Sequence, residues 1–287
     1  MHAGGRTIVV ARHAGYCYGV ERALRIAHEA ADRLATPVAS LGPIIHNPVV
    51  VEELAARGVR AVDAPSEVES GAVLVRTHGV PPEVVDDARR RGLDVIDATC
   101  PFVAAAQRKA AALVEGGYVV VLLGERRHPE VAGILARAGG DTLVVEDVDE
   151  IDADALRGAR VGIVVQTTQT PQALAALAER VAPVARETLI HNTICEATEQ
   201  RQVAAREMAA DVECVVVVGG HESANTRRLA GLCRGIQPRT WHIERAGDLA
   251  AAELADCATI GVTAGASTPE TEIAATVEVL AGLPPLR

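Results

Sequence analysis

Three of the six cysteines in this chain stand where a thiol could bind a metal. Each follows a short apolar run that is typical of a buried strand and precedes a stretch that is typical of a helix; they are Cys17, Cys100 and Cys195. Pro101 favours the first turn of a helix, where its missing N–H costs nothing. The positive end of a helix dipole favours a thiolate over a thiol. Three thiolates from three similar units would make a metal or iron–sulfur site with one coordination position open.

The other three cysteines lie within or beside strand and helix patterns. We expect Cys214, Cys233 and Cys257 to be small core hydrophobes. The spacing of the first three does not by itself identify a metal, because the sequence has no C-x-x-C or H-E-x-x-H motif. It also lacks the G-x-x-x-x-G-K and G-x-G-x-x-G motifs of nucleotide-binding loops.

Several polar residues share the position between a strand and a helix, where backbone N–H groups bind anions. They are His46, His78, His128, Ser223, Asn225 and Ser267. Ser223, Asn225 and Ser267 can equally be helix N-caps. Glu130 has two interpretations, a carboxylate favoured by the helix dipole or an acid that takes part in catalysis. We expect His2, His13, His28, His191 and His242 to be surface or capping residues.

The composition narrows the classes of partner. Aromatic residues make up only 2% of the chain and the formal net charge is −10, which argues against nucleic acid and anionic membranes as general partners. No stretch approaches the ~20 continuous apolar residues of a membrane span, and the N-terminus has no signal-peptide core. We therefore expect a cytoplasmic protein, in which cysteines are more often reduced, metal-bound or buried than paired in disulfides.

Strand and helix patterns alternate along the chain. Expected strands cover 7–11, 38–42, 72–76, 95–97, 118–123, 160–165, 189–190, 214–218 and 258–262. Such alternation favours an α/β fold with mostly parallel sheets, whose ligands bind beyond the carboxyl ends of the strands. We place the boundaries near the second and third cysteines, which gives three similar αβ units at 1–100, 101–195 and 196–287.

Nine short motifs, taken together and in order, resemble those of one family. They are GYCYGVERA at 15–23, IHN at 45–47, THGV at 77–80, DATCP at 97–101, HPEV at 128–131, QTT at 166–168, TIC at 193–195, SAN at 223–225 and AGAS at 264–267. The family is that of 4-hydroxy-3-methylbut-2-enyl diphosphate reductase, an enzyme of the methylerythritol phosphate route to isoprenoids. The resemblance extends from about Gly15 to Pro269.

The resemblance implies a trefoil of three αβ units around a central cavity, and a [4Fe–4S] cluster held by Cys17, Cys100 and Cys195. The fourth iron would bind the allylic hydroxyl of the substrate. Reduction by a ferredoxin or flavodoxin would remove that hydroxyl as water and give isopentenyl or dimethylallyl diphosphate. The diphosphate would be held by His46, His78, Ser223, Asn225 and Ser267. The resemblance also places His128 and Thr167 at the hydroxyl end of the substrate, where Glu130 would deliver protons.

Two positions depart from the family pattern. Ala224 stands where a second serine is usual, so one hydroxyl donor to phosphate is missing, although the Ala224 backbone N–H can still contribute. Tyr16 replaces the usual phenylalanine. A competing interpretation is a non-catalytic cluster or zinc protein that senses redox state or iron. It needs only the three cysteines and leaves Thr167 and Glu130 without a role.

Overall fold

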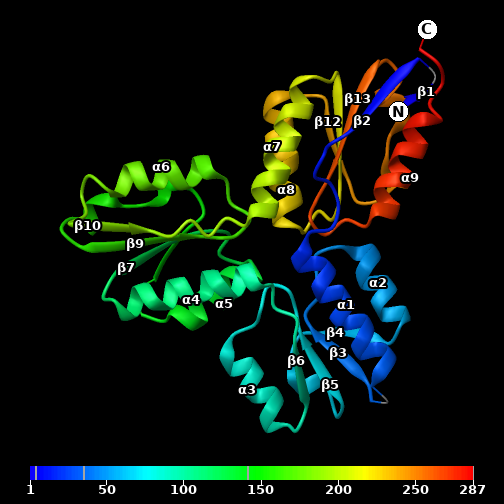
Figure 1. The fold of residues 1–287 in the computed structure, drawn as a ribbon. Coiled ribbons are helices and arrows are strands. Elements are labelled where there is room, and N and C mark those ends of the chain that lie inside the picture. The colour runs from blue at the N-terminus through cyan, green and yellow to red at the C-terminus, as the bar shows by residue number, and fades with distance from the viewer. Residues whose placement is uncertain (4, 35, 141, 287) are drawn as a thin grey trace. The chain divides into compact units, whose positions relative to one another are not determined.

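The computed structural model describes residues 1–3, 5–34, 36–140 and 142–286, and within them helices and strands alternate (Figure 1). The helices are α1 (Tyr18–Arg33), α2 (Pro48–Ala56), α3 (Pro82–Arg90), α4 (Pro101–Glu115), α5 (Pro129–Ala138), α6 (Pro171–Val181), α7 (Glu196–Ala210), α8 (Ala224–Ile236) and α9 (Glu270–Ala281). The strands are β1 (His2–Ala3), β2 (Arg6–Val10), β3 (Val38–Leu41), β4 (Val59–Val62), β5 (Ala72–Val75), β6 (Asp94–Asp97), β7 (Val119–Leu123), β8 (Thr142–Val145), β9 (Arg160–Val165), β10 (Glu187–Ile190), β11 (Cys214–Val218), β12 (Thr240–Ile243) and β13 (Thr259–Ala264). The predicted α/β class is confirmed.

The strands form three sheets with one recurring order. Two sheets have four parallel strands each, in the orders β4-β3-β5-β6 and β10-β9-β7-β8. When the strands of each sheet are numbered by their order in the chain, both sheets have the spatial order second, first, third, fourth. The third sheet has the order β1-β2-β13-β11-β12, and its only antiparallel pair among the described residues is β1 with β2.

The fourth strand of the third sheet comes from the start of the chain. In this sheet β11, β12 and β13 of the C-terminal segment are the first, second and third strands, and they lie side by side in the order β12-β11-β13. Strand β2 is the fourth: it pairs with β13 in parallel, with Thr7 opposite Thr259. The boundaries at 1–100, 101–195 and 196–287 stay a prediction, although the strand at the start of 1–100 pairs with the sheet of 196–287. The three C-terminal strands leave one edge of their sheet without a neighbour, and β2 pairs with that edge.

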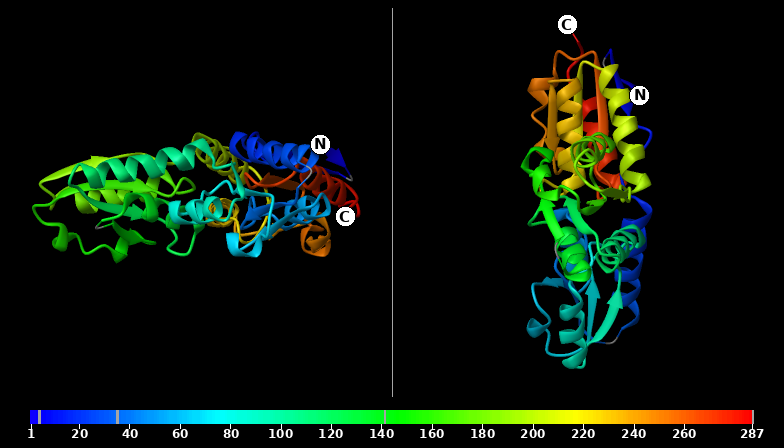
Figure 2. Two further views of the ribbon diagram at one scale, coloured as in Figure 1. Left: turned by 90° about the horizontal axis from the view of Figure 1, so that it is seen from below. Right: turned by 90° about the vertical axis from the view of Figure 1, so that its left-hand side faces the viewer.

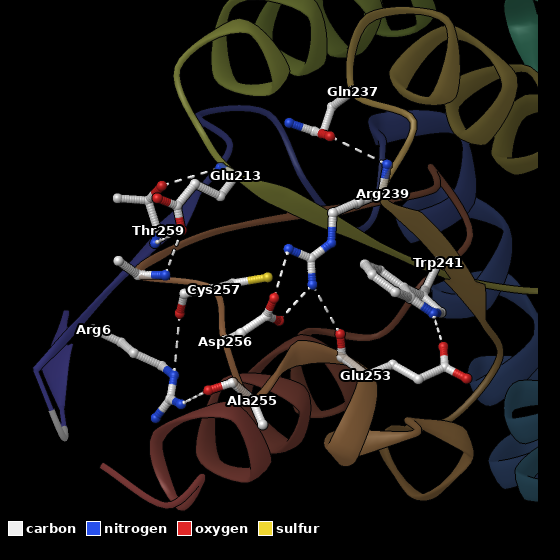
Figure 3. A network of polar contacts seen from close by, with 11 residues as sticks. Arg6, Glu213, Gln237, Arg239, Trp241, Glu253, Ala255, Asp256, Cys257 and Thr259 are labelled. Atoms are coloured by element: carbon white, nitrogen blue, oxygen red, sulfur yellow. Dashed lines mark hydrogen bonds and ion pairs between the residues drawn. The ribbon is translucent and has the colours of Figure 1, made fainter. Parts of the chain in front are cut away.

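A buried arginine fixes β2 in that place. Arg6 is 1% exposed, and its Nε donates to the carbonyl of Cys257 at 3.1 Å (Figure 3). Its Nη2 donates to the carbonyl of Ala255, and its Nη1 donates to that of Pro284. The segment before β2 and the segment around Pro284 therefore lie at the same end of this sheet (Figures 1 and 2). These hydrogen bonds connect β2 to the segment that contains Ala255, Cys257 and Pro284.

The central strands of each sheet form the core. Strand β11 is fully buried along its length, and four residues of β7 and five of β9 are buried because helices cover both faces of their sheet. Helices α4 and α5 pack on one face of the β7–β9 sheet, and α6 packs on the other. Among the described residues, none of the helices is long and apolar enough to cross a membrane.

By its contacts the chain divides into two compact units. One consists of Met1–Glu21, His46–Glu52 and Glu196–Arg287, and it contains the sheet that β2 completes. The other consists of Arg22–Ile45 and Glu53–Cys195, and it contains the two four-stranded sheets.

Candidate active site

The three candidate ligand cysteines occupy equivalent places in the three sheets. Each follows a fourth strand, and each backbone N–H donates to the carbonyl of the second residue after the third strand of the same sheet. The N···O distances are 3.1 Å for Cys17 to Ala266, 2.9 Å for Cys100 to Thr77 and 3.0 Å for Cys195 to Thr167. All three cysteines are half-buried. The fold thus holds each of them beyond the carboxyl end of a parallel sheet, where ligands of such sheets bind.

The other three cysteines are core residues, as expected. Cys214, Cys233 and Cys257 are 0% exposed and belong to the apolar clusters around β11, β13 and α8. Burial raises the pKa of Cys233 to about 11. Burial and a hydrogen bond with Cys257 raise the pKa of Cys214. Metals bind thiolates that a ligand can reach, so these enclosed thiols do not fit a metal group, whereas the three half-buried cysteines do.

A second set of equivalent positions follows the first strand of each sheet. A glycine comes directly after β3, β7 and β11, and its N–H donates to the last carbonyl of the second strand. These glycines are Gly42, Gly124 and Gly219, with N···O distances of 2.7, 2.9 and 2.8 Å. Four residues beyond them stand His46, His128 and Ser223. The structure therefore places three of the predicted substrate-binding residues at one recurring position.

Glu130 reaches beyond its own helix. The side chain is 1% exposed, its Oε1 accepts the backbone N–H of Thr167 at 2.6 Å, and its Oε2 accepts the Thr167 hydroxyl at 2.8 Å. Thr167 lies in the turn after β9, and its carbonyl accepts the N–H of Cys195. The structure thus brings together Glu130 and Thr167, as the resemblance implies, and connects both to a candidate ligand cysteine. This carboxylate is more than a dipole-favoured residue in the first turn of α5.

His128 contacts the backbone of Glu130, and His78 contacts the ring of His128. The Nδ1 of His128 accepts the N–H of Glu130 at 3.1 Å, which caps α5 and leaves the proton of a neutral ring on Nε2. The rings of His78 and His128 meet edge to face, with centroids 5.0 Å apart. His78 follows β5 and His128 follows β7, so the turns of two neighbouring sheets of this unit meet here. Two imidazoles, a carboxylate and a hydroxyl form a group that can bind an oxygen and move a proton.

The first unit carries four of the five residues expected to bind the diphosphate: His46, Ser223, Asn225 and Ser267. Ser223 caps α8, because its Oγ accepts the N–H of Thr226 at 3.3 Å. Asn225 lies in the first turn of that helix and is 7% exposed. Within the described residues its buried Nδ2 has no hydrogen-bond partner. A buried amide donor and a capping hydroxyl at the N-terminus of a 13-residue helix are suited to an anion. Ala224 lies between them and is 2% exposed.

Ser267 and the His46 segment meet in the same unit. The Ser267 Oγ donates to the carbonyl of His46 at 3.4 Å, and the Nδ2 of Asn47 donates to the carbonyl of Ser267 at 2.9 Å. The backbones approach so closely that a Cβ on Gly220 would lie 2.5 Å from the His46 carbonyl oxygen. The structure thus places the predicted residues His46 and Ser267 side by side.

Two further buried polar residues, Asn47 and Gln107, carry no role in the prediction from sequence. Asn47 is 2% exposed and joins the cap of α2 to Ser267, accepting the N–H of Val49 at 3.0 Å. An asparagine directly before a proline-initiated helix is a signal that could have revealed it. Gln107 is 2% exposed in α4, and its Nε2 lies 2.8 Å from where a Cβ on Gly133 would be. One glutamine in an alanine-rich helix gives no such signal.

Comparisons with known proteins match nearly the whole chain. A family profile described as LytB protein matches residues 8–281. The 4-hydroxy-3-methylbut-2-enyl diphosphate reductase of Geotalea uraniireducens is 43% identical over 263 residues, which cover 92% of this chain and 93% of that protein. The reductase of the same name from Geobacter sulfurreducens is 44% identical, with the same shares covered.

Two solved structures are similar to this one. A structure of (E)-4-hydroxy-3-methyl-but-2-enyl diphosphate reductase, described as the terminal enzyme of the non-mevalonate pathway, has a TM-score of 0.70 and 39% identity, and the match covers 96% of this chain and 99% of that one. The E-1-hydroxy-2-methyl-but-2-enyl-4-diphosphate reductase of Plasmodium falciparum has a TM-score of 0.89 and 26% identity, with 98% and 90% covered. The sequence motifs, the recurring sheets and these matches together show that the chain belongs to the LytB family of oxidoreductases, the family of the 4-hydroxy-3-methylbut-2-enyl diphosphate reductases.

Proposed function

We propose that this protein reduces 4-hydroxy-3-methylbut-2-enyl diphosphate to isopentenyl and dimethylallyl diphosphate. The carbon–oxygen bond of the allylic alcohol breaks, and two electrons enter the substrate. One proton joins the departing oxygen to form water, and a second joins either end of the allyl unit. One observation carries this proposal: the buried carboxylate of Glu130 accepts hydrogen bonds from the N–H and the hydroxyl of Thr167. The carbonyl of Thr167 in turn accepts the N–H of Cys195.

The electrons require a redox group, and the half-buried thiols are suited to one. Cys17, Cys100 and Cys195 would hold a [4Fe–4S] cluster, because they are the cysteines at equivalent strand ends, and the remaining three are enclosed. When bound, the cluster supplies electrons and an iron with an open position that acts as a Lewis acid at the hydroxyl end of the substrate.

The residues around Glu130 handle the protons. Expulsion of hydroxide from an allylic carbon is slow at neutral pH, so the oxygen needs a proton as it leaves. Glu130 is the proton donor in this proposal, and Thr167 fixes the direction of its carboxylate through two hydrogen bonds. His128 donates from Nε2 to the departing oxygen, because its Nδ1 is occupied by the Glu130 N–H. Their burial keeps water from competing for the proton.

The diphosphate would be bound by hydroxyl, amide and imidazole groups. Ser223, Asn225 and Ser267 offer hydroxyl and amide donors near the start of α8, and His46 and His78 add imidazoles. Backbone N–H groups at a helix N-terminus favour negative charge, and Ala224 contributes its own N–H to that set. A local site of this kind overcomes the net charge of −10 of the whole chain.

The electron donor in this proposal is a ferredoxin or flavodoxin, and the reaction takes place in the cytoplasm. Neither nucleic acid nor a membrane takes part. The electron donor must deliver one electron at a time at low potential, which these two classes of protein do.

The test is an anaerobic assay of protein reconstituted with iron and sulfide. With a chemical reductant, the protein should convert the hydroxylated diphosphate into the two isoprenoid diphosphates. The Cys100→Ser variant should lack both iron and activity, whereas Cys233→Ser should retain both. A protein that gains the cluster's visible absorption, yet neither turns over the substrate nor changes its spectrum when the diphosphate is added, would be a sensor instead.

A further inference from the structure

A buried arginine holds the backbone before Cys17. Arg201 lies in the second turn of α7 and is 5% exposed. Its Nη2 donates to the carbonyl of Gly15 at 2.7 Å and to that of Tyr16 at 3.0 Å. Its Nη1 donates to the carbonyl of Ala197 in its own helix at 2.8 Å. One guanidinium thus joins a helix to the two peptide groups that lead into a candidate ligand cysteine.

The shape of that turn is unusual and depends on glycine. Gly15 has a φ of +86°, and a Cβ there would lie 3.1 Å from the Cδ1 of Ile273. The next carbonyl belongs to Tyr16 and is part of the peptide bond to Cys17, whose N–H donates to Ala266. Contacts on both sides of this peptide bond, from Arg201 and from Ala266, therefore fix the direction in which Cys17 leaves the turn.

A second arginine makes the corresponding contact before Cys100. Arg22 is half-buried in α1, and its Nη1 donates to the carbonyl of Thr99 at 3.1 Å. The Thr99 N–H donates to Asp97, and the Cys100 N–H donates to the carbonyl of Thr77. The residue before each of these two cysteines thus gives its carbonyl to a guanidinium. Arg22 is five positions after Cys17 and Arg201 is six positions after Cys195, so both arginines come from the second turn of a helix that follows a candidate ligand.

We propose that Arg201 and Arg22 are positioning residues for Cys17 and Cys100, and that their charge raises the reduction potential of the group that these cysteines hold. The inference rests on the proposed ligand role of the cysteines. A guanidinium stays charged at every physiological pH. A fixed positive charge next to a ligand favours the state that carries one more electron, so it makes reduction easier. In the proposed reaction the group must take up electrons before it passes them to the substrate, and such a charge favours the uptake.

The first experiment uses the metal-free protein, so that it does not depend on the cluster. Hydrogen exchange is followed by mass spectrometry in the peptide that covers 14–18, in wild type and in Arg201→Met. Methionine keeps the length of the side chain but not its donors. Loss of hydrogen bonds to a charged group should speed exchange of the Cys17 amide roughly tenfold, while exchange in β11 stays unchanged. Arg201→Lys keeps the positive charge but lacks the planar set of donors of a guanidinium, so it should protect the Cys17 amide from exchange only in part.

The second experiment measures the midpoint potential of the reconstituted cluster by redox titration with electron paramagnetic resonance. Arg201→Met and Arg22→Met should each shift it to more negative values, and Arg201→Lys should stay close to wild type. Arg25→Met is the control, because Arg25 lies on α1 with Arg22 but is 65% exposed and pairs with Glu29. Unchanged exchange in Arg201→Met, or potentials in both Met variants equal to that of Arg25→Met, would overturn the inference. A wild type that binds no cluster would refute the proposed function, yet the exchange result would still decide the positioning role.

Discussion

Replacing Glu130 by glutamine separates proton donation from structure. In the wild type, Oε1 accepts the Thr167 N–H at 2.6 Å and Oε2 accepts the Thr167 hydroxyl at 2.8 Å. A glutamine keeps Oε1 in its place. Its NH2 then takes the place of Oε2 and donates to the Thr167 oxygen, whose own hydrogen is free to rotate. Both contacts therefore survive the change, but the side chain can no longer deliver an acidic proton.

The magnitudes follow from this geometry. With both hydrogen bonds retained, the free energy of unfolding should change by no more than about 1 kcal/mol. A positioned general acid contributes about 10²–10⁴ in rate, which corresponds to about 2.7–5.5 kcal/mol of transition-state stabilisation. Glu130→Gln should therefore lose turnover by that factor, with the iron content and the substrate affinity close to wild type.

The assay is anaerobic steady-state turnover, paired with denaturant unfolding of the same preparation. Thr167→Val is the companion variant, because it removes the hydroxyl but keeps the N–H that binds Oε1. It should slow turnover less than Glu130→Gln and lower stability by about 1–3 kcal/mol, since Oε2 loses its buried donor. Turnover of Glu130→Gln within threefold of wild type would refute the assignment of Glu130 as the donor.

Three further changes test the rest of the molecule. Cys100→Ser should lower the bound iron and sulfide and bleach the visible absorption, while Cys233→Ser, in the core, should leave both in place. Asn225→Ala removes a buried donor and should weaken diphosphate binding by about 1.5–3 kcal/mol in calorimetry without loss of iron; Ala224→Ser should tighten it slightly, and equal affinities would exclude both positions from the site. Arg6→Met leaves the carbonyls of the last segment without their donor and should lower the unfolding free energy by at least about 2 kcal/mol, a loss that thermal unfolding would detect.

The first, third and fourth strands of each sheet could be predicted from the sequence, and the second strands could not. The first and third strands of each sheet are apolar runs with helices on both faces, and they lie where they were expected. The second strands β4, β8 and β12 were missed. They lie at sheet edges and their middle residues are half-buried or exposed, so no continuous apolar run marks them.

The predicted site residues came from motifs, and their partners came only from the fold. Glu130 and Thr167 are 37 positions apart, and no local pattern indicates that one holds the other. The contact of Arg201 with Gly15 spans 186 positions. The sequence also does not predict which sheet β2 joins, because its apolar run indicates only that it is a strand. Such pairings depend on the edge left open by a distant segment.

The origin of β2 has a consequence for how the protein is made. Arg6 can donate its hydrogen bond to the carbonyl of Cys257 only after that residue, 251 positions further along the chain, has been synthesised. At about 5–20 residues per second, the ribosome takes roughly 10–50 s to supply that partner. Throughout this time the first strand, and with it the Cys17 turn, has no sheet to join. The nascent chain can thus fix the turn before Cys17 only after the segment around Cys257 has been made, so the proposed cluster could be loaded only after that point.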